Sequence, residues 1–501
     1  MSRRTSAGAA VLIASRLIAR CIDFAALLVL ARLLSPADFG LVAIAMAVIM
    51  VTEAALELSL WQALVRLPLT RAHFDTAFTL ALLRALVVVL ILFVAAWPLA
   101  RLYGDDRLIP LIYALALAPA VRGLGSARMI EYVKKLDYRR EFVLEFAGKV
   151  AAFIVSVSLA WYTGSYWALA AGTIAAPITT VIASYVLAPY RPRLTLRKWR
   201  SFAGFLGWST AAQVVNALNW QMDQLVLGRF VNPIELGRFA MAANLAALPA
   251  QVFIARVLSP LMVTFSFIKK DHRRLTLAYQ NSAITILAAG LPMMVGISVM
   301  SEPLLRLVLG AQWMEAADVL RWLSLAVVPA FFFAPLAPLS MALNRTEIFL
   351  RLALLELFFR LPIVLVGAIS YGVTGIVVAR LATAFVMAAS SAVAVRELLG
   401  LSLRAQVFSA WRPVVSTLAM ALVIIPMEAW LANVRGLPLA LGMSGVIFVA
   451  VVVYAGTIFI LWRLAGCPEG FESKIVGALA HYWRAIVTDR RIWKLVPRDE
   501  I

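Results

Sequence analysis

The chain has 501 residues, of which 63% are hydrophobic and 14% are charged, and its formal net charge at pH 7 is +20. The polar side chains are too few to cover the surface of a soluble fold. The composition therefore excludes a soluble protein and places the chain in a lipid bilayer. The positive charge requires no nucleic-acid partner, because anionic lipid headgroups also attract basic segments.

Apolar stretches follow one another along nearly the whole chain, and each is long enough to cross a hydrocarbon core of about 30 Å. We therefore expect an all-α polytopic membrane protein with about fourteen transmembrane helices. The expected spans are 7–31, 39–65, 74–100, 108–131, 141–162, 166–189, 202–228, 236–265, 277–301, 316–343, 347–369, 373–395, 411–432 and 438–464. The first span does not have the pattern of a cleavable signal peptide, because it is long and contains Arg16, Arg20 and Asp23.

The turn after the first span is repeated after the seventh. Arg32-Leu-Leu-Ser-Pro36-Ala-Asp38-Phe-Gly40 matches Arg229-Phe-Val-Asn-Pro233-Ile-Glu235-Leu-Gly237, about 200 residues later. In each copy the proline presets the turn, the carboxylate lies at a helix start, and the glycine permits close packing. Two further matches follow in the same order: Pro98-Leu-Ala-Arg101-Leu with Pro303-Leu-Leu-Arg306-Leu, and Leu144-Glu145-x-x-x-Lys149 with Leu355-Glu356-x-x-x-Arg360.

These matches predict an internal duplication. The repeated turns are an even number of crossings apart, so the halves should have the same orientation, as two parallel six-helix repeats plus two C-terminal helices. The expected parts are an N-terminal repeat (1–189), a basic cytoplasmic linker (190–200), a C-terminal repeat (201–400), an extra helix pair (401–465) and an amphipathic basic tail on the cytoplasmic surface (466–501).

Basic residues lie mainly in alternate loops, which is the positive-inside pattern. With Arg3 and Arg4 inside, both termini are expected in the cytoplasm. The basic loops on that side contain Arg66 and Arg71; Lys134, Lys135, Arg139 and Arg140; Arg191, Arg193, Arg197, Lys198 and Arg200; Lys269, Lys270, Arg273 and Arg274; Arg345 and Arg351; and Arg396 and Arg404.

Several charges fall at membrane depth, where each costs on the order of 3 kcal/mol. Arginines facing a watery cavity would attract an anion, and guanidinium groups suit phosphate oxygens. Four arginines have no obvious local partner and are the first candidates for substrate binding: Arg16, Arg20, Arg122 and Arg380. Arg84 and Arg256 are further candidates, although both lie near enough to the cytoplasmic end to reach the interface instead.

Acidic residues at the same depth are candidates for coupling to protons or sodium, and Asp23 and Asp223 are the two selected. Two pairs at i, i+4 spacing offer a simpler interpretation, in which the charges neutralise each other. These pairs are Glu145 with Lys149 and Glu356 with Arg360.

Enzymatic chemistry finds little support in the sequence. The histidines are scattered at His73, His272 and His481, and no phosphate-binding Gly-Lys-Ser/Thr loop is present. We therefore expect no catalytic residues, metal or cofactor. A membrane glycosyltransferase or polymerase stays open as an alternative, but it would need a larger segment outside the membrane.

In its sequence of three motifs, the chain resembles the polysaccharide transporter (Wzx-type flippase) branch of the multidrug/oligosaccharidyl-lipid/polysaccharide flippase superfamily. These motifs are the first repeated turn, Leu136-Asp-Tyr-Arg-Arg140, and Leu307-Val-Leu-Gly310-Ala-Gln-Trp313 followed by Ala316-Ala-Asp-Val-Leu-Arg321. The resemblance covers essentially the whole chain.

This resemblance implies a flippase that moves undecaprenyl-pyrophosphate-linked oligosaccharide across the bacterial inner membrane, for O-antigen, capsule or exopolysaccharide assembly. It also implies a cationic cavity. We further expect alternating access of two helix bundles, with a polysaccharide polymerase and chain-length machinery as partners. A lipid II flippase of the same superfamily and a multidrug antiporter remain alternatives; the antiporter would more naturally have an acidic cavity.

Overall fold

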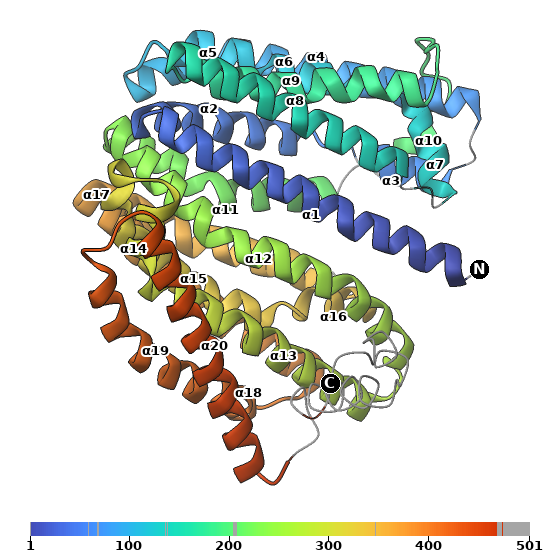
Figure 1. Ribbon diagram of the computed structural model, residues 1–501. Coiled ribbons are helices and arrows are strands. Elements are labelled where there is room, and N and C mark those ends of the chain that lie inside the picture. Colours follow the sequence, from blue (N-terminus) through green and yellow to red (C-terminus); the bar gives the residue numbers. More distant parts are fainter. Residues whose placement is uncertain are drawn as a thin grey trace, which may run out of the picture. The chain divides into compact units, whose positions relative to one another are not determined.

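The computed structural model describes residues 2–467 and Ser473, except for 59, 68–69, 136, 138, 204–207 and 346. Every regular element in these residues is a helix (Figure 1). The expected amphipathic helix of the tail lies outside the described residues.

The first half contains long helices and several short ones that together occupy the expected spans. The elements are α1 (Ser2–Leu33), α2 (Pro36–Ala55), α3 (Leu60–Arg66), α4 (Arg71–Tyr103), α5 (Leu108–Leu115), α6 (Leu117–Arg122), η1 (Ala127–Met129), α7 (Ile130–Lys134), α8 (Arg139–Thr163) and α9 (Trp167–Leu187), followed by the short α10 (Trp199–Ala203).

The second half continues in the same way. Its elements are α11 (Trp208–Phe230), α12 (Pro233–Ile268), α13 (His272–Val299), α14 (Ser301–Val308), η2 (Ala311–Ala316), α15 (Ala317–Phe333), α16 (Leu336–Ala342), α17 (Glu347–Leu399), α18 (Leu403–Ser409), α19 (Trp411–Leu431) and α20 (Leu437–Leu464).

Helix length and composition support the membrane assignment. Within the described residues, 9 helical segments are long and apolar enough to cross a bilayer, and 10 if the bent pair Leu108–Arg122 and Ala127–Lys134 forms one span. One of them, α17, contains two expected spans that reverse at Gly372, whose φ of 55° is in the left-handed region. Glycine permits this turn, and the carbonyl oxygen of Gly367 lies 1.9 Å from where a Cβ of Gly375 would be. The prediction of an all-α multi-pass membrane protein is confirmed.

The chain forms two compact units. The first comprises Met1–Asn244, Leu304–Leu320 and Leu350–Thr383, and the second comprises Leu245–Pro303, Arg321–Phe349 and Ala384–Ile501.

In the first unit, both copies of the repeated turn are capped alike. The amide of Asp38 donates to Ser35 Oγ (3.3 Å), while the amide of Ser35 donates to Asp38 Oδ2 (3.0 Å) at the start of α2. At the start of α12, Asn232 Oδ1 accepts from the amide of Glu235 (2.8 Å), and its Nδ2 donates to Glu235 Oε1 (3.3 Å). The carboxylates therefore lie at the helix starts, as the sequence predicts, and Ser35 and Asn232 provide the capping oxygens.

The basic linker in this unit is tied to the start of α4. The buried carboxylate of Asp75 accepts hydrogen bonds from the Tyr190 hydroxyl and from the Arg193 amide (3.2 Å). Burial, followed by the bond to Asp75, raises the pKa of Tyr190. The amide of Thr195 also donates to Thr79 Oγ1 at 3.0 Å, so the linker is an ordered segment.

In the second unit, α19 and α20 pack against α13. The hydroxyl of Tyr454 on α20 donates to the carbonyl of Ala288 on α13 (2.6 Å), and Arg321 on α15 pairs with Glu428 on α19 (3.5 Å). The extra helix pair is therefore fastened by polar contacts as well as by apolar packing.

Candidate functional site

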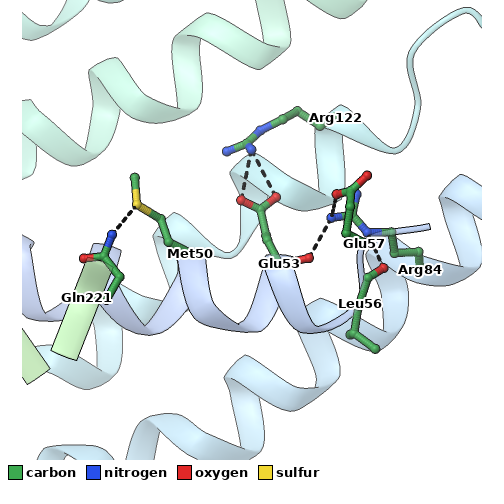
Figure 2. Close-up of polar contacts among 7 residues, drawn as sticks. All are labelled: Met50, Glu53, Leu56, Glu57, Arg84, Arg122 and Gln221. Carbon is green, nitrogen blue, oxygen red and sulfur yellow. Dashed lines mark hydrogen bonds and ion pairs between the residues drawn. The ribbon is translucent and has the colours of Figure 1, made fainter. Parts of the chain in front are cut away.

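The second expected span is interrupted where α2 ends at Ala55, before α3 begins at Leu60, and Arg84 on α4 bonds to backbone carbonyls at this interruption (Figure 2). Its Nε donates to the carbonyl of Leu56 (2.8 Å), and its Nη2 donates to the carbonyl of Glu53 (3.0 Å) and to Glu57 Oε2 (2.8 Å). A helix end leaves carbonyls without partners, which is costly at membrane depth, and a guanidinium satisfies several at once. Arg84 therefore closes the end of α2.

The fourth expected span is also broken, because the helices before and after residues 123–126 are bent by 50°. The α9 side chains satisfy backbone groups of this break: Tyr185 donates to the carbonyl of Leu124 (3.0 Å), and Ser184 Oγ accepts from the amide of Ser126 (3.1 Å).

The two breaks are joined by one ion pair. Arg122, the last residue of α6, donates from Nη1 to both carboxylate oxygens of Glu53, each at 3.0 Å (Figure 2). The side chain of Arg122 is 51% exposed and that of Glu53 is 17% exposed. The sequence suggested no local partner for Arg122, and its partner indeed comes from another helix, 69 positions away in the sequence.

A cavity of about 720 Å³ lies beside this pair, within the first unit. Its walls are mostly apolar and come from α1, α3, α4, α8, α9 and the broken fourth span. Three of its lining residues carry charge: Asp23, Arg122 and Lys149. Irregular backbone at membrane depth is tolerated where it lines a cavity, so the break after Arg122 is consistent with a ligand site.

Asp23 and Lys149 pair across this cavity. Lys149 Nζ lies 2.7 Å from Asp23 Oδ1 and 2.9 Å from Oδ2, and the two side chains are 35% and 37% exposed. The interpretation that Lys149 is neutralised by Glu145 was wrong, because α1 lies against α8 and brings Asp23 to the lysine.

A second cluster lies between α11 and α17, and its central pair, Arg360 and Asp223, is almost completely buried. Arg360 donates to Asp223 Oδ2 (2.8 Å) and to Glu356 (3.0 Å), and Arg380 also bonds to Asp223 Oδ2. The side chains of Arg360 and Asp223 are 2% and 1% exposed. The i, i+4 pairing of Glu356 with Arg360 is confirmed, but Arg380, for which the sequence suggested no local partner, is paired with Asp223.

The two clusters share a pattern that follows the sequence repeat. Lys149 and Arg360 occupy the same position of a sequence motif that occurs twice, and each pairs with an aspartate on an earlier helix, Asp23 on α1 or Asp223 on α11. The first pair lines a cavity, whereas the second is buried and has an additional arginine.

The remaining candidates are less defined. Arg20 is exposed on α1, and the structure records no partner for it among the described residues. The side chains of Arg16 and Arg256 lie outside the part that the structure describes. Among the described residues, no group of three or more His, Cys, Asp or Glu side chains could hold a metal ion.

Comparison with known proteins gives a consistent family. The model of a family described as "polysaccharide biosynthesis protein" matches residues 29–318. The succinoglycan biosynthesis transport protein ExoT of Rhizobium meliloti is 27% identical over 63% of this chain, and the match covers 65% of ExoT, less than two thirds of its length. The lipopolysaccharide biosynthesis protein WzxC of Escherichia coli is 24% identical over 77% of this chain and 80% of its own length.

Solved structures show the same fold at low identity. Lipid II flippase MurJ, in an inward closed conformation, aligns with a TM-score of 0.72 and 13% identity over 90% of this chain and 99% of its own. A multidrug resistance MATE family transporter of the MOP superfamily, in an inward-facing conformation, aligns with a TM-score of 0.59 and 14% identity over 76% and 95%.

The chain therefore has the multi-pass membrane fold of these two structures. Because the family model matches more than half of its length, the chain belongs to the polysaccharide biosynthesis protein family.

Proposed function

We propose that the chain is a flippase that moves undecaprenyl-pyrophosphate-linked oligosaccharide across the plasma membrane for O-antigen, capsule or exopolysaccharide assembly. The observation that carries this proposal is the mostly apolar cavity with Arg122 and Lys149 in its lining. Apolar walls suit a polyprenyl chain, and the two cations suit its pyrophosphate. The family match and the names of ExoT and WzxC support a polysaccharide precursor as cargo.

In this proposal Arg122 is the first phosphate ligand, because half of its side chain is exposed beside the cavity. Arg20 is exposed on α1, and Arg16 precedes it by one turn, so both would attract the headgroup as it enters. Arg84, Arg256 and Arg380 complete the cationic set; Arg84 and Arg380 would act mainly through long-range charge, because each is already bonded.

Asp23 and Asp223 are the proposed ion-coupling carboxylates. Asp23 suits a role in proton or sodium exchange because it is partly exposed and has one cationic partner. Asp223 Oδ1 has no hydrogen-bond partner among the described residues, which leaves one buried acceptor available for a proton.

The proposed setting is the bacterial inner membrane, with both termini in the cytoplasm and two parallel six-helix repeats that alternate access. The duplicated caps at Ser35 and Asn232 support the repeat. Polymerase and chain-length proteins that act on the exported unit are the proposed partners.

The fold of lipid II flippase MurJ favours one second candidate, a flippase for lipid II. The two functions are distinguished by removing the gene from its host and identifying the lipid-linked precursor that accumulates on the cytoplasmic side. Accumulation of an oligosaccharide repeat unit, with normal peptidoglycan, is the expected result. Accumulation of lipid II would contradict the proposal.

A further inference from the structure

We infer that the Glu53 carboxylate occupies the place of a substrate phosphate on Arg122. It holds Arg122 in position while the cavity is empty, and a pyrophosphate that enters the cavity displaces it. This inference rests on the proposed function and assigns a role to a residue that does not itself line the cavity.

The geometry of the pair suits exchange. Both oxygens of the Glu53 carboxylate share one nitrogen of Arg122, Nη1, and the structure records no bond from Nε or Nη2 to a described residue. The guanidinium is therefore only partly used, and its open edge is available for the fork-like contact that phosphate oxygens make. A pyrophosphate carries more charge than a carboxylate, so it competes well for the same cation.

The Glu53 carboxylate can leave Arg122 without opening the end of α2. The backbone carbonyl of Glu53 accepts a hydrogen bond from Arg84, and this bond does not depend on the carboxylate. Arg84 does not line the cavity and is fixed by the carbonyls of Glu53 and Leu56, so it remains in place as Arg122 changes partner.

Glu57 provides a matched comparison. It lies four residues later in the chain, just beyond the end of α2, and also pairs with an arginine, at 2.8 Å from Arg84 Nη2; its side chain is 37% exposed. Arg84 keeps its two carbonyl bonds without Glu57, so neutralising Glu57 releases no cation toward the cavity.

The test measures binding of geranylgeranyl pyrophosphate to the purified full-length chain in detergent, with geranylgeraniol as the probe without phosphate. Glu53→Gln is expected to bind the pyrophosphate about fivefold more tightly, since an ion pair as exposed as this one is worth up to about that factor. Glu57→Gln should stay within about twofold of wild type. Arg122→Gln should lose about tenfold, and adding Glu53→Gln to it should bring no gain.

Thermal unfolding of each variant shows whether the fold is intact, and Glu53→Asp, which keeps the charge but shortens its reach, should bind with intermediate affinity. The role of Glu53 would be overturned if Glu53→Gln and Glu53→Asp both bind with wild-type affinity while Arg122→Gln loses binding. The proposed substrate site would still be supported in that case. An equal gain for geranylgeraniol would also overturn the role of Glu53, because the effect would not concern the anion. Wild-type affinity in Arg122→Gln would remove the proposed site itself.

Discussion

Gly40 and Gly237 meet backbone to backbone in a reciprocal contact. A Cβ on Gly40 would lie 1.9 Å from the carbonyl oxygen of Pro233, and a Cβ on Gly237 would lie 1.8 Å from that of Pro36. Each imaginary Cβ is also 2.9 Å from the amide nitrogen of the other glycine. Because the two residues are repeat equivalents, the exchange of roles is what a twofold axis between the two turns would produce, and it supports the parallel-repeat proposal.

The first prediction is that Gly40→Ala and Gly237→Ala each reduce stability strongly. The new methyl group would overlap a backbone carbonyl, which cannot move aside as the end of a side chain can. The loss of unfolding free energy should therefore exceed the roughly 1–3 kcal/mol that ordinary overpacking costs. The measurement is the fraction of monodisperse protein after heating in detergent.

Gly296→Ala is the control, since nothing lies within 4 Å of its added Cβ. Alanine in that helix should be neutral or stabilising by about 1 kcal/mol. Equal behaviour of the three variants would contradict the close contact.

A second prediction separates Asp23 and Asp223, which pair with Lys149 and Arg360 respectively. Asp223→Asn leaves two arginines beside Asp223 without their full charge partner, one of them completely buried, and should cost about 3–5 kcal/mol. Asp23→Asn breaks a pair that is about one-third exposed and should cost about 1 kcal/mol or less. Unfolding midpoints of the purified variants measure the difference.

If Asp23→Asn loses transport while its midpoint stays near the wild-type value, the coupling proposal for Asp23 is supported. A larger stability loss in Asp23→Asn than in Asp223→Asn would contradict the burial argument.

The sequence predicts a structural feature well when the residues that form it are close together in the chain, and poorly when they are far apart. The capped turn at Ser35 and Asn232 and the pair Glu356–Arg360 are local, and both were predicted. The partners of Lys149 and Arg122 were not, because they come from helices distant in the sequence.

The helix breaks show the same division. Gly123 and Gly125 lie in the break of the fourth span and offer a signal for it. Residues 56–59 contain neither glycine nor proline, so the second span was expected to be continuous from 39 to 65. The arginine at position 84, provided by another helix, gives the carbonyls of Glu53 and Leu56 at that break a hydrogen-bond partner, which lowers their cost in the membrane.

A third prediction concerns topology, and it follows from the basic loops and the even number of expected crossings. Reporter fusions at Arg200 and Ile501 should report the cytoplasm, and a fusion at Gly310 should report the outside. Removing the basic residues of the linker serves as a control for the charge rule. A fusion at Arg200 that reports the outside would contradict the parallel arrangement of the halves.

The last prediction tests the cationic residues through transport. Arg20, Arg122 and Arg380 are each changed to Gln and to Lys, and export of the glycan is measured in the host at matched protein abundance. For Arg122, Gln should strongly reduce export, whereas Lys should retain part of it, because lysine keeps the charge but lacks the planar fork that binds two phosphate oxygens.

For Arg20, which is exposed and has no recorded partner among the described residues, Lys should serve nearly as well as Arg, because attraction at long range depends on charge alone. For Arg380, Gln should lower protein abundance before it affects export, because Arg380 bonds to the buried carboxylate of Asp223. Full export in Arg20→Gln and Arg122→Gln would remove both residues from the proposed substrate path and leave the transport function to rest on the family match.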